Sequence, residues 1–99
     1  MIKKISLYCV VNQNEGTIVS DMDGEKVMMS VRNGKYYNLG RMGGEIWELM
    51  KSPVEVERVV SVLMSQYDVA QNDCENQVLS FLEGLYKDEL IQVTCTTDV

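Results

Sequence analysis

The chain has 99 residues, which fits a single domain of modest stability. Its 15 acidic residues outnumber its 9 Lys and Arg residues, and the net charge of −6 argues against binding to nucleic acid or to an anionic membrane, because both rely on clustered cations. The absence of histidine excludes Ser-His and Cys-His catalytic triads and histidine-rich metal sites.

The first 40 residues carry the alternation and the turn signals of β-strands. Residues 5–11 are β-prone and lead into a turn at 12–16, so we expect an extended segment there, with its pairing partner left open. Residues 17–22 and 25–31 are two more β-prone runs, joined by Asp23-Gly24. This dipeptide is a strong hairpin signal because both residues tolerate positive φ.

A third β-prone run, residues 35–39, follows an Asn-Gly turn signal. The run before it alternates, and we expect its apolar face to consist of Val27, Met29 and Val31. Three sequential strands joined by tight turns predict an antiparallel meander. The first and last strands of a meander each present unpaired backbone donors and acceptors on one edge.

Helical spacing begins after the third strand. A short helix is predicted over 41–50, with Trp47, the only tryptophan, as its anchor in the core. Ser52, Pro53 and Glu55 have the pattern of a capping box, which predicts that the second helix begins there. The glycines near the start of the first helix suit close backbone packing, because they have neither P-loop nor dinucleotide-binding spacing.

The third helix is predicted to begin at a cap formed by Asn72, with Glu75 three residues later, and to end at 87–89. Its apolar stripe consists of Cys74, Val78, Phe81, Leu82 and Leu85. Gly84 weakens the helix, so we expect it to have a packing role. Residues 90–93 are predicted to form a final short strand. The predicted fold class is therefore α+β, a three-stranded antiparallel sheet followed by three helices in a winged helix-turn-helix arrangement.

The cysteines, Cys9, Cys74 and Cys95, are far apart and odd in number, which fits neither a disulfide framework nor a zinc site. We expect reduced thiols in a cytoplasmic protein. Cys74, near a helix start, is either a reactive thiol or a small buried residue, and the lack of a nearby base favours burial. The N-terminal region lacks a signal-peptide core, and no apolar run is long enough to cross a membrane.

No persuasive catalytic or metal-binding cluster is found in the sequence. Asp21 and Asp23 flank a hairpin turn, where Asp is common for local reasons, and further oxygen ligands for a cation are missing. The third strand is different, because it is short, aromatic and directly followed by glycine. A peptide that adds to its edge would be held by main-chain hydrogen bonds, with the stripe of the third helix as a wall. For each residue of that stripe, core packing and groove contact remain open.

Residues 23–50, D-G-E-K-V-M-M-S-V-R-N-G-K-Y-Y-N-L-G-R-M-G-G-E-I-W-E-L-M, resemble the PqqD-like family. More closely, they resemble the stand-alone RiPP recognition elements of lasso-peptide biosynthesis. The Y-Y-N-L strand and the I-W-E-L helix are the most specific parts of the match. The resemblance covers residues 17–93 and leaves out the first 16.

The resemblance implies one domain over residues 1–99, with a core at 17–93, that binds peptide and has neither enzymatic activity nor a cofactor. The implied partners are the leader of a ribosomally made precursor, a leader peptidase of the transglutaminase-like cysteine protease type, and the lasso cyclase. The leader would add to the third strand and lie against the third helix. The implied peptide-binding residues are Lys35, Tyr36, Tyr37, Asn38, Leu39, Cys74, Val78, Phe81, Leu82 and Leu85. Pleat parity decides whether Tyr36 or Tyr37 faces the leader, and the sequence leaves this open.

Two other functions compete with peptide binding. A winged-helix DNA-binding regulator would need a cationic recognition helix. The third helix instead carries Asp73, Glu75, Glu83 and Asp88 against Lys87 alone. A small enzyme or metal protein fits poorly, because histidines are absent and the cysteines are scattered.

Overall fold

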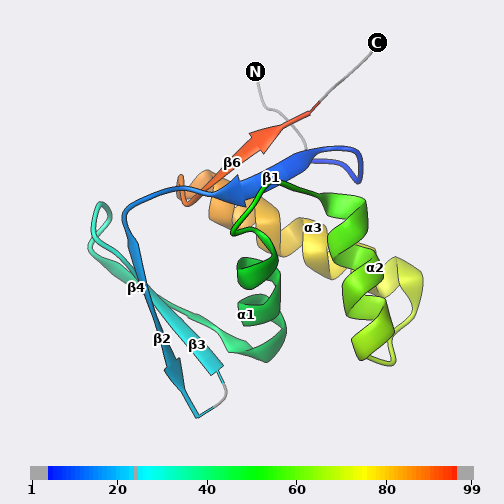
Figure 1. The fold of residues 1–99 in the computed structure, drawn as a ribbon, viewed down its shortest axis with the longest axis horizontal. Helices are drawn as coiled ribbons and strands as arrows, with labels where there is room; N and C mark the ends of the chain where they lie inside the picture. Colours follow the sequence, from blue (N-terminus) through cyan, green and yellow to red (C-terminus); the bar gives the residue numbers. More distant parts are fainter. Residues whose placement is uncertain (1–4, 24, 96–99) are drawn as a thin grey trace.

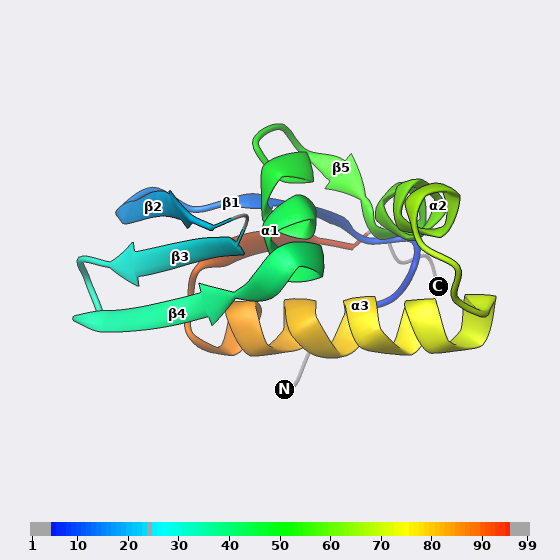
Figure 2. The same ribbon diagram turned by 90° about the horizontal axis from the view of Figure 1, so that it is seen from below.

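The computed structural model describes residues 5–23 and 25–95 and shows an α+β fold with three helices and two antiparallel sheets (Figure 1). The helices are α1 (Gly40–Leu49), α2 (Val56–Gln66) and α3 (Gln71–Lys87). One sheet has the strand order β2-β3-β4, and the other has the order β5-β1-β6. In both views α1 lies between the first sheet and α2 (Figures 1 and 2).

The first sheet is the meander that the turn signals predict. Its strands are β2 (Thr17–Met22), β3 (Glu25–Ser30) and β4 (Lys35–Leu39). The β2–β3 turn includes Asp23 at a φ of 56°, and the β3–β4 turn includes Gly34 at a φ of 66°, so the turn residues adopt the left-handed conformations that such turns require.

The predicted core face of β3 is wrong. Met28 and Ser30 are buried, whereas Val27 and Met29 lie on the opposite side of the pleat and Val31 is 61% exposed. The reason is that α1 packs against β3 and covers the side that carries Met28. A one-residue change of parity exchanges the two faces of a strand, and here the face with Lys26, Met28 and Ser30 turns inward although the other face is more apolar.

The second sheet was not predicted as a unit. It consists of β1 (Val10–Gln13), β5 (Val54–Glu55) and β6 (Ile91–Thr94). The expected extended segment at 5–11 is a strand only at its end, and β1 runs into the predicted turn. The final strand at 90–93 is confirmed with a shift of one residue. The N-terminal segment therefore pairs with the chain's own C-terminal strand.

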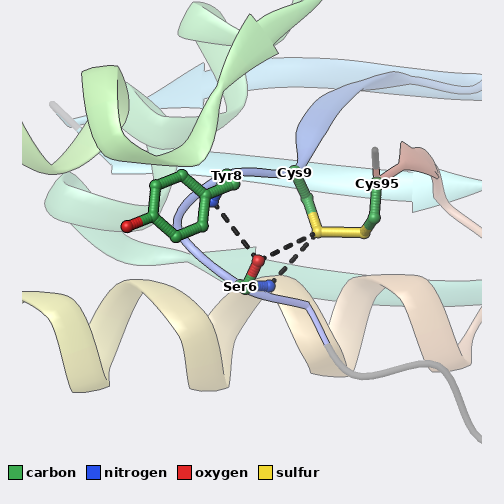
Figure 3. The surroundings of a disulfide bond; sticks show 4 residues. All are labelled: Ser6, Tyr8, Cys9 and Cys95. Atoms are coloured by element: carbon green, nitrogen blue, oxygen red, sulfur yellow. Dashed lines mark hydrogen bonds between the residues drawn. A yellow bond between two sulfur atoms is a disulfide. The ribbon is translucent and has the colours of Figure 1, made fainter. Parts of the chain in front are cut away.

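A disulfide joins Cys9 to Cys95, which corrects the expectation of three reduced thiols (Figure 3). Val10 pairs with Thr94 in the antiparallel β1–β6 ladder, so the residues just outside this pair lie opposite each other, with Cα atoms 4.1 Å apart. Spacing along the sequence does not reveal this pairing, because 86 positions separate the two cysteines. Ser6 donates its backbone N–H to the Cys9 Sγ at 3.3 Å.

The predicted helix caps are also wrong. The segment at Ser52 and Pro53 is an exposed loop, residues 54–55 form β5, and α2 begins only at Val56 without a side-chain cap. The segment that precedes β1 replaces that cap. Val56 N–H donates to the Cys9 carbonyl at 2.9 Å, and Glu57 N–H donates to the Leu7 carbonyl at 3.0 Å, which satisfies two of the free donors at the helix start.

The start of α3 likewise has no side-chain cap. Ala70 occupies the cap position and Asn72 lies inside the first turn. The predicted end of the helix at 87–89 is close to the observed end at Lys87.

The core lies where α1, α2 and α3 meet the two sheets. Trp47 is 2% exposed, which confirms it as the anchor of α1. The buried side chains around it come from every layer and include Val11, Met28, Ile46, Val59, Leu63, Val78, Leu82 and Ile91. Among the described residues, no helix is both long and apolar enough to cross a membrane.

Candidate functional site

Strand β4 is an edge strand, because in residues 5–23 and 25–95 it pairs only with β3. Gly34 N–H donates to the Ser30 carbonyl at 2.8 Å, and Val31 N–H donates to the Gly16 carbonyl at 3.0 Å. Ser30 therefore directs its backbone groups toward β4, and so does Met28, two residues away. Met28 pairs with Tyr37. The alternate residues, Tyr36 and Asn38, must then direct their N–H and C=O groups toward the free edge.

The side chains of β4 alternate between the two faces of the sheet, which answers the question of parity. Tyr36 lies on the outer face and is 75% exposed. Tyr37 lies on the α3 side, where its hydroxyl donates to the Asp88 Oδ2 at 3.0 Å. Asn33 donates from Nδ2 to the Asp88 carbonyl at 3.1 Å, so the β3–β4 turn is held to the end of α3.

A groove of about 330 Å³ runs between β4 and α3, both of which lie along the lower side of Figure 2. We call it the β4–α3 groove. It is lined by Tyr37, Asn38, Leu39, Ser80, Phe81, Gly84, Leu85 and Asp88. Its lining combines apolar side chains with backbone and polar groups, which is the composition expected of a site for an extended peptide.

Only part of the predicted helix surface reaches this groove. Phe81 and Leu85 line it, whereas Cys74, Val78 and Leu82 are 0% exposed and pack in the chain's own core. The stripe through Cys74, Val78 and Leu82 repeats every four residues and faces inward, so these three side chains are not available to a peptide in this structure. A charge at Leu82 would disrupt the core and would not test the groove.

Three groove residues escaped sequence reasoning, namely Ser80, Gly84 and Asp88. They repeat every four residues, so they lie along one face of α3 and its C-terminal cap residue, Asp88. The sequence shows these residues as a small, polar stripe beside the apolar one. It does not show the hydrogen bond between Tyr37 and Asp88. Gly84 has no packing role of the expected kind, since a Cβ added there would meet no atom within 4 Å. Its missing side chain leaves the wall of the groove open.

Gly43 and Gly44 of α1 do have the predicted role of allowing close packing. A Cβ at Gly43 would lie 3.0 Å from the Phe81 ring, and one at Gly44 would lie 3.0 Å from the Lys26 side chain. Because Gly43 has no side chain, the Phe81 ring can pack closely against α1 beside the groove.

Lys26 of β3 forms two ion pairs away from the groove. Lys26 Nζ lies 2.8 Å from the Asp21 Oδ1 and 3.5 Å from the Glu48 Oε2. The hydrogen bond to Asp21 raises the pKa of Lys26. The hydrogen bond from Lys51 lowers the pKa of Glu48. Among the described residues no group of three or more His, Cys, Asp or Glu side chains is arranged to hold a metal ion.

Cys74 is a buried residue, as favoured from the sequence. Its Sγ lies 3.9 Å from the Val60 carbonyl oxygen, to which it donates. Burial raises the pKa of the Cys74 thiol above its ordinary value, which favours the protonated form. A protonated, inaccessible thiol is a poor nucleophile.

Solved structures with the same fold include two peptide complexes. TbiB1 in complex with the TbiA(beta) leader peptide matches with a TM-score of 0.74 and 25% identity, over 82% of this chain and 94% of that one. Lasso peptide synthetase B1, complexed with the leader peptide, matches with a TM-score of 0.72 and 20% identity, over 83% of this chain and 96% of that one.

A third structure and a family model extend the comparison. The PqqD truncation of Methylobacterium extorquens PqqCD, described as a functional and stand-alone RiPP recognition element, matches with a TM-score of 0.74 and 17% identity, over 89% of this chain and 94% of that one. Comparison with curated proteins finds no relative. The family model for coenzyme PQQ synthesis protein D (PqqD) matches residues 25–91, well over half of the sequence. The chain therefore belongs to the PqqD family.

Proposed function

We propose that the chain binds the leader peptide of a lasso-peptide precursor. The leader adds as a further strand to the free edge of β4, and alternate side chains enter the β4–α3 groove. The single observation that carries the proposal is an unpaired strand edge directly beside a groove that contains apolar side chains. The similarity to TbiB1, whose structure holds a leader peptide, supports it.

Backbone and side-chain contacts contribute comparable amounts to this binding. The N–H and C=O groups of Tyr36 and Asn38 can make hydrogen bonds worth about 1 kcal/mol each. An apolar leader side chain fully buried against Leu39 and Phe81 would add about 1.5–3 kcal/mol. Because neither source dominates, we expect binding to need both an extended backbone and an apolar anchor.

The proposal also includes a more detailed description of the fold. We propose a winged helix-turn-helix domain over residues 1–99, with a core at 17–93, in which α2 and α3 form the helix pair and the β3–β4 hairpin forms the wing. The acidic side chains of α3, including Asp73, Glu75 and Glu83, would repel a phosphate backbone. Peptide binding is therefore favoured over DNA binding.

The chain itself would have no enzymatic activity. It would present the bound leader to a leader peptidase of the transglutaminase-like cysteine protease type and to the lasso cyclase. We place this work in the cytoplasm, where ribosomally made precursors arise. Disulfides are rare in that compartment, so the domain should remain folded when the Cys9–Cys95 bond is reduced.

Fluorescence anisotropy tests the proposed function. The probes are a fluorescein-labelled leader peptide of a lasso precursor and a labelled DNA duplex, both at moderate salt. We expect saturable micromolar binding of the leader and none of the duplex. Duplex binding without leader binding would overturn the proposal in favour of a regulator.

A further inference from the structure

The β4–α3 groove continues into a second hollow at the end where β4 begins. This hollow, of about 430 Å³, is lined by Arg32, Asn33, Lys35, Lys87, Asp88 and Glu89. We call it the cationic hollow. Asp88 lines both it and the groove, so the two are adjacent. A strand that adds along β4 must therefore pass the cationic hollow at one end.

The charge of this hollow is opposite to that of the whole molecule. It gathers three of the 9 Lys and Arg residues but only two of the 15 acidic ones, in a chain of net charge −6. Both acidic groups already have partners. The Asp88 Oδ2 accepts from the Tyr37 hydroxyl at 3.0 Å, and the Glu89 Oε1 lies 3.4 Å from the Arg32 Nη1.

The two lysines have no such partner. Within residues 5–23 and 25–95, neither Lys35 nor Lys87 has a carboxylate within 4.0 Å of its Nζ. Lys87 in the last turn of α3 also interacts favourably with the helix dipole. A lysine on an edge strand also discourages aggregation. Neither the helix-dipole interaction nor protection against aggregation would make the chain prefer one peptide sequence over another. A measured peptide preference therefore distinguishes a binding role for these lysines from the two structural roles.

Strand parity gives the hollow a place in a peptide motif. Lys35, Tyr37 and Leu39 share one face of β4, because side chains alternate with a period of two. A peptide side chain opposite Tyr37 or Leu39 enters the β4–α3 groove. The side chain opposite Lys35 is then two or four residues away on the same face of the peptide.

We infer that the groove selects peptides in which an Asp or Glu lies two or four residues from an apolar anchor, with its carboxylate between Lys35 and Lys87. This inference rests on the proposed function and adds a recognition rule to it. Ion pairs at an exposed site are weak, so the expected preference for Glu over Gln is about three- to tenfold in affinity. It should shrink as salt is added.

A positional scan tests this rule. Short fluorescein-labelled peptide pools, made otherwise of Val, Leu, Thr, Tyr and Ser, carry a fixed Leu, Glu, Gln or Lys at each position in turn, and anisotropy is measured with the full chain. The Leu scan locates the anchor. We expect Glu to be preferred two or four residues from it, with the preference lost in the K35Q/K87Q double variant and reversed toward Lys in K35E.

The matched control is R58Q, which removes one exposed cation from α2 on another part of the surface. It should leave the Glu preference unchanged. Circular dichroism checks that each variant is folded. A Glu preference that survives in folded K35Q/K87Q, or peptides bound with no Glu preference, would overturn the inference and leave the proposed function intact. If no pool binds the wild-type chain, the inference is overturned, while the proposed function is decided by the separate anisotropy measurement with the leader peptide.

Discussion

At the scale of single residues, the hydrogen bond between Tyr37 and Asp88 is the contact that ties β4 to α3. We predict that Tyr37→Phe lowers the free energy of unfolding by about 1 kcal/mol, because the Asp88 carboxylate loses its donor. Urea denaturation measures this change. The matched control is Tyr36→Phe, since Tyr36 is exposed and on the other face of the strand. Equal midpoints for the two variants would show that the bond contributes nothing.

Gly84 separates stability from binding. Because a Cβ there meets no atom within 4 Å, Gly84→Ala should raise the free energy of unfolding by about 0.5–1 kcal/mol through better helix propensity. Gly84→Met should also leave the fold intact, but its side chain would enter the β4–α3 groove and weaken leader binding at least tenfold. Thermal unfolding and anisotropy check the two effects. A Gly84→Met variant with normal leader affinity would show that the leader does not use this wall.

At the scale of elements, the free edge of β4 is tested by removing one of its donors. Asn38→Pro deletes an N–H that points toward the proposed leader strand, so leader affinity should fall about tenfold while the fold survives. Asn38→Ala is the control, because it keeps the N–H and loses only the side chain, whose Oδ1 accepts from the Gly40 N–H at 3.0 Å. If the proline variant is folded and binds as the alanine variant does, strand addition is the wrong mode.

Local signals predicted the elements that are themselves local. The meander follows from two turn dipeptides, and α1 and α3 follow from their helical spacing. The second sheet could not be predicted, because β5 has two residues and β1 and β6 pair across nearly the whole chain. The wrong cap at Ser52 has the same origin. The local capping pattern predicted a helix start that the structure does not have. The free N–H donors at the start of α2 bond instead to the carbonyls of Leu7 and Cys9, which are distant in the sequence.

The sequence also predicted only part of the candidate site. The strand half lies along the open edge, and its role in binding stays a prediction. For the helix half, an apolar repeat identifies the buried stripe of α3 more readily than the stripe that lines the groove. Cys74, Val78 and Leu82 therefore belong to the core, and the groove uses the neighbouring face with Ser80 and Gly84.

At the scale of the whole molecule, the two sheets have different roles. The β5-β1-β6 sheet closes the chain on itself through the Cys9–Cys95 bond, while the β2-β3-β4 sheet presents the proposed binding edge. A thiol titration of the denatured chain checks the bond, and it should find Cys74 as the single reactive cysteine. Because the disulfide and the binding edge belong to different sheets, loss of the disulfide should lower the stability of the chain without changing its affinity for the leader.

We therefore predict that replacing both Cys9 and Cys95 by serine lowers the free energy of unfolding by about 2–4 kcal/mol, because the bond closes a loop of 86 residues in the unfolded chain. Leader affinity should stay within about twofold of wild type, since neither cysteine contacts the groove and an unchanged fold leaves its free energy of binding unchanged. Urea denaturation and anisotropy on the same samples measure the two quantities. A variant that is folded at the temperature of the assay but has lost leader binding would show that the two sheets are coupled, and that the closed chain shapes the edge of β4.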